Sequence, residues 1–133
     1  MGSYPIEEWE AGAATVAARL HRGGHTPMAA NGMAELDPEL ASLVQVLARG
    51  RFYADDVVDL KTRALCTMAC LVATGEQPYI ENWMTNAITA GSTVQEITSL
   101  LGQLFVYVGT PRAVTAYDAL VAVRDRIAAE PAS

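Results

Sequence analysis

Residues 93–111, TVQEITSLLGQLFVYVGTP, contain a complete helix with both of its ends. Thr93 and Glu96 form a capping box, in which the hydroxyl and the carboxylate each accept a hydrogen bond from a backbone N–H of the first turn. Apolar side chains then recur at helical spacing until Gly109 ends the run. Because Pro111 suits the first turn of a helix, a further helix is expected to begin immediately afterwards. The stretch predicts two consecutive helices and no strand.

The same order of cap, apolar stripe and terminating glycine repeats on the N-terminal side of this stretch. It predicts helices over residues 3–24, 37–50, 59–75 and 78–91, before those over 93–109 and 110–127. The last of these carries one apolar stripe, made of Val114, Tyr117, Leu120, Val121 and Ile127. The sequence therefore predicts an all-α fold, a compact bundle of about six helices, in a single domain over residues 1–133.

Charge and composition narrow the class of partner. The 133 residues carry 9 Lys and Arg against 15 Asp and Glu, a net charge of −6 that disfavours nucleic acid and anionic membrane surfaces. The apolar fraction is 51%, yet no run reaches the roughly 18 apolar residues of a membrane span. We expect so apolar a chain to hide surface against copies of itself, as a homo-oligomer. The acidic start carries no secretion signal, and two cysteines make no disulfide scaffold, so we expect a cytoplasmic protein.

Three polar side chains share one face of the helix over residues 93–109. Ser99, Gln103 and Tyr107 recur every four residues, beside the apolar stripe. They are candidates for hydrogen bonds to a ligand. The alternative is a solvated face of the helix.

Arg63, Cys66 and Cys70 lie at positions i, i+3 and i+7 of the helix over residues 59–75. A guanidinium beside a thiol favours the nucleophilic thiolate, which would suit thiol peroxidase activity. The alternative is that both cysteines fill the core as small apolar residues. No phosphate-binding loop, nucleophile elbow, His-Glu-x-x-His or Cys-x-x-Cys motif accompanies them.

His25 and Trp83 are the remaining candidates. His21 and His25 are four residues apart, but the two glycines between them break the helix that would align them on a metal, so we expect no metal site. His25 alone can exchange protons near neutral pH as a general acid or base, or can simply be exposed. Trp83 occupies an apolar helical position, where it either fills the core or stacks against an aromatic ligand.

Three stretches resemble the carboxymuconolactone decarboxylase family: DLKTRALCTMACLVATG (59–75), NAITAGSTVQEI (86–97) and YVGTPRA (107–113). WEAG at residues 9–12 is similar to the opening of the true decarboxylases, so the resemblance covers almost the whole chain. It implies an all-helical subunit related to the alkyl hydroperoxidase D proteins. It also implies a homotrimer, or a homohexamer of paired trimers.

The departures from the family pattern all remove charge. Val16 and Ala17 stand where the decarboxylases carry an Arg pair, Trp83 and Gln103 stand where they carry histidines, and Ser99 replaces a glutamate. The redox Cys-x-x-Cys of the peroxidase branch is also missing from its expected place. Residues that match the family pattern are Arg63, Tyr107 and, with one residue of slack, His25.

A site without these charges favours an uncharged, aromatic or polycyclic ligand. The leading hypothesis is a lyase, cyclase or isomerase that needs no cofactor and acts on a hydrophobic, polyketide-like molecule of specialised metabolism. Tyr107, Gln103 or His25 would move a proton or polarise a carbonyl. The expected substrate contacts are Trp83, Ser99, Arg63, Cys66 and Cys70. The alternatives are a relaxed decarboxylase for an acid that readily loses carbon dioxide, and a non-catalytic oligomer that binds a ligand or a partner.

Overall fold

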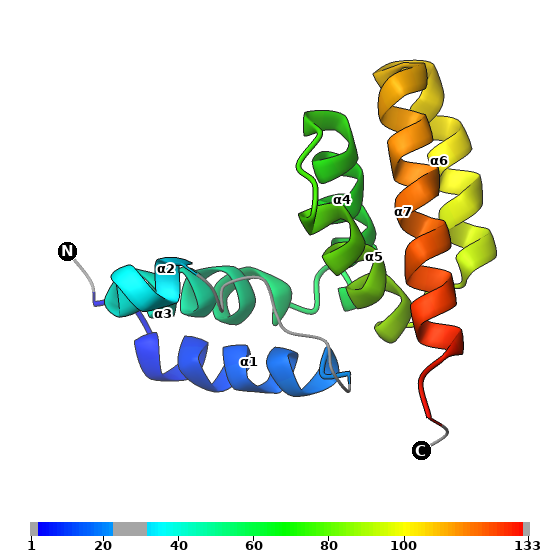
Figure 1. Cartoon of the computed structure of the whole chain (residues 1–133). Helices are drawn as coiled ribbons and strands as arrows, with labels where there is room; N and C mark the ends of the chain where they lie inside the picture. Colours follow the sequence, from blue (N-terminus) through cyan, green and yellow to red (C-terminus); the bar gives the residue numbers. More distant parts are fainter. Residues whose placement is uncertain (1–2, 23–31, 132–133) are drawn as a thin grey trace. The chain divides into compact units, whose positions relative to one another are not determined.

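The computed structural model describes residues 3–22 and 32–131, and every regular element in them is helical (Figure 1). This confirms the predicted all-α class. The elements in chain order are α1 (Ile6–Arg19), α2 (Gly32–Leu36), α3 (Pro38–Gln45), the π-helix η1 (Val46–Tyr53), α4 (Leu60–Thr74), α5 (Tyr79–Thr89), α6 (Val94–Val108) and α7 (Thr110–Ala128). They form two compact units, Met1–Leu60 and Lys61–Ser133, and each is described by itself. The single domain stays a prediction.

The predicted caps are present at the atomic level. The Thr93 side chain accepts a hydrogen bond from the Glu96 backbone N–H at 3.0 Å, which fixes the start of α6. The Asp37 carboxylate accepts one from the Leu40 N–H at 3.0 Å, at the start of α3. At the other end of α6, Gly109 has a φ of +88°, a conformation that favours glycine, and α7 begins at the next residue.

Gly50 does not end a helix, which corrects one expected boundary. α3 continues without a break into η1, which carries the helical path past Gly50 to Tyr53. A Cβ atom added to Gly50 would overlap the backbone carbonyl of Trp9 in α1. The glycine therefore lets two helical backbones touch, a use that the local sequence does not distinguish from termination.

Two other boundaries differ from expectation. α1 begins at Ile6 and its α-helical part ends at Arg19, so it is shorter than the helix expected over residues 3–24. The glycines expected to end that helix lie outside the described residues. α2 is a short helix that the sequence pattern did not predict.

In the first unit, α1 packs along η1, and α3 leads into η1 on the same side (Figure 1). Val16, Leu20 and Ala41 are buried there, together with the charged residue Arg49. Burial lowers the pKa of the Arg49 guanidinium below its ordinary value, and the interaction with Tyr53 opposes part of that shift.

In the second unit, α6 and α7 form an antiparallel pair joined at Gly109, and α5 packs on α7 (Figure 1). The Tyr117 hydroxyl on α7 donates a hydrogen bond to the Thr98 carbonyl on α6 at 3.4 Å. Arg126 donates to the Thr85 hydroxyl at 2.8 Å, which ties α7 to α5. The core draws on all four helices, with Met68, Met84, Ile97, Leu101, Leu120 and Val123 among its buried side chains.

The buried face of α7 differs from the expected stripe. Its small residues are buried instead, namely Ala113, Ala116 and Ala119, with Leu120 and Val123. Val114, Tyr117 and Val121 of the expected stripe are exposed. Alanine on the inner face lets neighbouring helices approach closely, which larger side chains would prevent.

Among the described helices, none combines the length and the apolar character that crossing a bilayer requires.

Candidate functional site

A groove of about 270 Å³ lies between α4 and α6 in the second unit. α4 contributes five residues along one face and its flank, and α6 contributes three residues within about one turn. The lining residues are Thr62, Leu65, Cys66, Met68, Ala69, Leu100, Gln103 and Leu104. The groove thus combines parts of the sequence that are more than thirty residues apart.

The chemistry of the groove is apolar with a polar rim. Met68 is fully buried, while Leu65 and Leu104 are half-buried. Cys66 and Gln103 are exposed, one from each helix, and they bring a thiol and a carboxamide to the same groove. Of the described residues that line it, none carries a charge. The groove therefore suits an uncharged ligand held by apolar contact and a few hydrogen bonds.

An ion pair joins the first turns of the two helices that form the groove. Lys61 Nζ lies 2.8 Å from Glu96 Oε2, and both side chains are partly exposed. Its hydrogen bond with Lys61 holds the pKa of the Glu96 carboxyl below its ordinary value of 4.5, with a smaller contribution from the hydrogen bond to Thr93. Because Lys61 directly precedes the groove residue Thr62, this pair connects α4 and α6 at one end of the groove.

Removing this ion pair is expected to change how Glu96 titrates. A carboxylate whose folded pKa is depressed stabilises the fold above its unfolded pKa, and this stability is lost as the pH falls through the folded pKa. Lys61→Met should raise the Glu96 pKa toward 4.5 and weaken that acid dependence. Carbon-detected NMR of the Glu96 carboxyl measures the shift.

The matched control is Arg124→Met, which removes an ion pair with Asp125 at 2.9 Å elsewhere on α7. It should leave the Glu96 titration unchanged. An identical titration curve for Lys61→Met and the unmodified chain would contradict the role given to this pair.

The structure brings two of the predicted site residues together and separates others. Cys66 and Gln103 line the groove, as described. Ser99 and Tyr107 are exposed on α6 but are not part of the lining, and the Tyr107 side chain is 82% exposed. They remain candidates that depend on what covers this face of α6.

Two predicted substrate contacts on α4 also lie outside the lining of the groove. Arg63 is half-buried and is engaged with other residues of the chain. Cys70 is exposed, like Cys66, and neither forms a disulfide. The alternative in which both cysteines fill the core is wrong, because their positions on α4 face outward while Ala64, Met68 and Val72 face inward.

Trp83 lies in the core of the second unit. It is only 5% exposed, on α5, and does not line the groove. His25 lies outside the described residues. Among those residues, no group of three His, Cys, Asp or Glu side chains is placed to hold a metal ion.

The apolar residues of the groove were not singled out from the sequence. Leu65, Leu100 and Leu104 belong to apolar stripes that predict burial, but they are half-buried walls of the groove. A leucine in a groove wall and a leucine in the core follow the same helical spacing, so the sequence does not distinguish them. The available signal was the interruption of those stripes by Cys66 and Gln103. It identified these two side chains without showing that they line the same groove.

Comparison with known protein families identifies the family of this chain. The profile of the carboxymuconolactone decarboxylase family matches residues 38–122, which is well over half of the chain and includes all of α4, α5 and α6. The chain belongs to the carboxymuconolactone decarboxylase family. The similarity noted at residues 9–12 lies outside the matched range. No curated protein matches the chain.

Proposed function

We propose that this member of the carboxymuconolactone decarboxylase family is an enzyme that works without a cofactor on an uncharged, hydrophobic small molecule. The groove between α4 and α6 would hold the substrate. The observation that carries this proposal is the composition of that groove, whose walls are apolar and whose exposed polar groups are a carboxamide, a thiol and the Thr62 hydroxyl. Such a site has no cation to grip a dicarboxylate substrate.

The chemistry that fits these groups is a lyase, cyclase or isomerase step. The Gln103 carboxamide donates a hydrogen bond to a substrate carbonyl, which stabilises negative charge on that oxygen as an enol or enolate forms. The groove walls hold the substrate in one conformer, so that less entropy is lost on the way to the transition state. Tyr107 follows Gln103 by one helical turn on α6 and would supply a proton from the same side.

The size of the groove limits the substrate. Its volume of about 270 Å³ is just below the roughly 300–1,000 Å³ of pockets for drug-sized ligands. We therefore propose a one-ring or two-ring substrate, smaller than the polycyclic ligand expected from the sequence.

A second copy of the chain is part of this proposal. Phe105, Val106 and Tyr107 follow the groove on α6 and are exposed, Val106 to 74%. An apolar run of this kind on a surface helix favours an interface between protein subunits. Assembly as a homotrimer or homohexamer would cover these side chains. The cytoplasmic location stays a prediction.

Binding to the groove is tested with prodan, an uncharged fluorescent naphthyl ketone. We expect a blue shift of its emission on binding, because the apolar walls exclude water from the dye. Ala69→Phe fills the groove and should weaken binding at least about tenfold, since a ring in the groove displaces the ligand. Gln103→Leu should retain binding and shift the bound emission further to the blue, because the ketone loses its hydrogen-bond donor.

The control is Ala122→Phe, at an exposed position on α7 outside the groove lining. It should bind prodan as the unmodified chain does. Equal binding by the Ala69→Phe and Ala122→Phe variants would place the dye elsewhere and overturn the assignment of the groove.

Catalysis is tested on the molecule that the protein retains from the cell. Native mass spectrometry of freshly purified protein gives the number of subunits and the mass of any bound organic molecule. That molecule is released, identified and returned to protein freed of it. Conversion that slows in Gln103→Leu supports an enzyme, whereas recovery of the unchanged molecule supports the non-catalytic ligand-binding alternative.

A further inference from the structure

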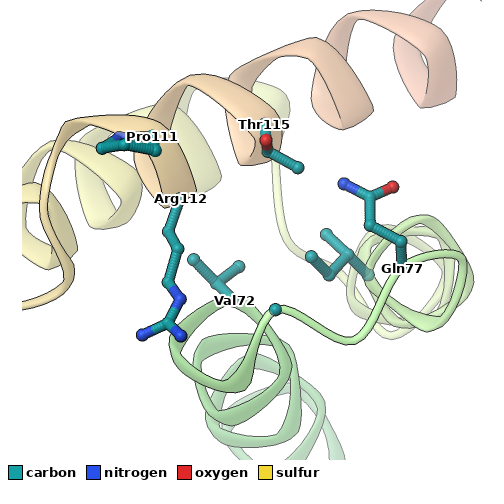
Figure 2. A pocket seen from close by; sticks show the side chains of 7 residues that line it. Val72, Gln77, Pro111, Arg112 and Thr115 are labelled. Atoms are coloured by element: carbon teal, nitrogen blue, oxygen red, sulfur yellow. The ribbon is translucent and has the colours of Figure 1, made fainter.

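A second pocket, of about 250 Å³, lies in the same unit and shares no residue with the groove (Figure 2). Four segments of the chain form it: the end of α4, the turn into α5, the first turn of α5, and the first two turns of α7. Its apolar walls are Val72, Ile80 and Pro111. Unlike the groove, this pocket has a charged side chain in its lining, Arg112.

The Arg112 side chain extends from α7 toward the end of α4, beside Val72 (Figure 2). Its Nε atom would lie 3.7 Å from a Cβ atom added to Gly75, so the guanidinium lies against the turn that follows α4. Gly75 has a φ of +74°, which favours glycine and keeps this approach free of a side chain. The helix end and its glycine thus leave room beside the guanidinium.

No ion pair within the described part of the chain involves Arg112. The neighbouring acidic groups do not neutralise it. Glu76 is exposed in the same turn without pairing to Arg112, and Glu81 on α5 lies 3.5 Å from Arg126 instead. Arg112 is an exposed residue. Its charge is available to a bound anion.

Two neutral polar groups complete the lining. The Gln77 side chain points from the turn into the pocket, and Thr115 lies on the facing turn of α7 (Figure 2). The backbone N–H of Gln77 is occupied, because it donates to the Gly75 carbonyl at 3.0 Å. The Gln77 carboxamide and the Thr115 hydroxyl offer hydrogen-bond donors on the side of the pocket away from the guanidinium.

We propose that this pocket binds a small monocarboxylate with a compact hydrocarbon body. The guanidinium matches a carboxylate with two parallel hydrogen bonds. Val72, Ile80 and Pro111 enclose the hydrocarbon part. A bare phosphate would leave those apolar walls uncovered, so the carboxylate is the better fit.

This binding site goes beyond the proposed function, because it selects a different class of molecule. The groove is free of charge along its described lining, and the Arg112 pocket selects an anion. A carboxylate in the pocket would join the turn after α4 to the first turn of α7. It would stabilise the folded second unit by an amount that grows with the logarithm of the ligand concentration once the site is occupied.

The test uses benzoate as the probe, with benzyl alcohol as its uncharged counterpart and inorganic phosphate as a second anion. Binding is measured by nitrogen–proton NMR, in which the backbone signals of Gly75, Gln77 and Thr115 report on the pocket. Benzoate should shift these signals at millimolar concentrations or below. Benzyl alcohol and phosphate should bind at least about tenfold more weakly, because each lacks one half of the recognition.

Arg112→Gln should weaken benzoate binding at least about tenfold, and Arg112→Lys should fall between it and the unmodified chain, because lysine keeps the charge but loses the paired donors. The control is Arg124→Gln, at an exposed arginine of α7 outside the pocket, which should bind benzoate normally. The proposal would be overturned if the unmodified chain did not bind benzoate, or if Arg112→Gln bound it as tightly as the unmodified chain does. Phosphate binding tighter than benzoate binding would also overturn it.

Discussion

Gly50→Ala is expected to destabilise the first unit by about 3 kcal/mol or more, the upper part of the range for overpacking. The added Cβ atom would overlap the Trp9 carbonyl oxygen and would lie 2.6 Å from its carbonyl carbon and 2.9 Å from its Cα. These are backbone atoms of α1, which cannot rotate away as a flexible side chain can. Gly12 faces the same contact, since a Cβ there would lie 3.2 Å from the Gly50 carbonyl oxygen.

Urea unfolding followed by Trp9 fluorescence measures this loss. The chain has 2 tryptophans, one in each unit, so a Trp83→Phe background leaves Trp9 as the reporter of the first unit. The control is Gly102→Ala inside α6, where the nearest atom to the new Cβ is the Tyr117 hydroxyl at 3.5 Å. It should be neutral or stabilising by up to about 1 kcal/mol, because alanine favours the helix over glycine. An unchanged midpoint for Gly50→Ala would show that α1 and η1 are not in backbone contact.

Trp83→Ala is expected to destabilise the second unit by about 3–5 kcal/mol, the range found when buried aromatic residues are truncated to alanine. Trp83 is 5% exposed, and the residues beside it on α5, from Met84 to Ala87, are buried as well. Its removal would leave a cavity in the core that the surrounding helices fill only partially. Urea unfolding followed by far-UV circular dichroism measures the loss, since the variant lacks its tryptophan reporter in this unit.

The same substitution separates the two interpretations of Trp83 that the sequence left open. If Trp83 is a core residue, Trp83→Ala lowers the free energy of unfolding. Trp83→Phe then lowers it less, because the smaller ring still fills part of the space. A residue that contacts the substrate would instead change prodan binding, while the free energy of unfolding changed by less than about 1 kcal/mol. That second outcome would contradict the placement of Trp83 outside the groove.

Local signals in the sequence were sufficient for most of the helices. Asp37 and Thr93 cap α3 and α6 with the hydrogen bonds expected of them, because a cap involves atoms only three residues apart. Gly75 and Gly109 end helices with positive φ values, as predicted. Gly50 misled the same reasoning. A glycine is needed at position 50 because the backbone of Trp9 lies against it. Trp9 is about forty residues away, so the local sequence pattern does not reveal this contact.

The candidate sites were predicted in part for a similar reason. Helical spacing placed Cys66 on α4 and Gln103 on α6 beside apolar stripes, and both line the groove. Spacing within one helix cannot show which face meets another helix. The Arg112 pocket was therefore missed, because its guanidinium lies against Gly75, from a segment more than thirty residues earlier.

The sequence by itself determined that the chain is all-α and where most helices begin and end, since these depend on contacts within one or two turns. It also determined the family resemblance that the match over residues 38–122 confirms. Only the tertiary structure decided which faces are buried. On α7, Ala113 and Ala116 face the core, while the larger Val114 and Tyr117 stay exposed. Helices pack most closely through small residues. The size and spacing of apolar residues therefore identify a stripe on a helix, but they do not show which residues face the neighbouring helices.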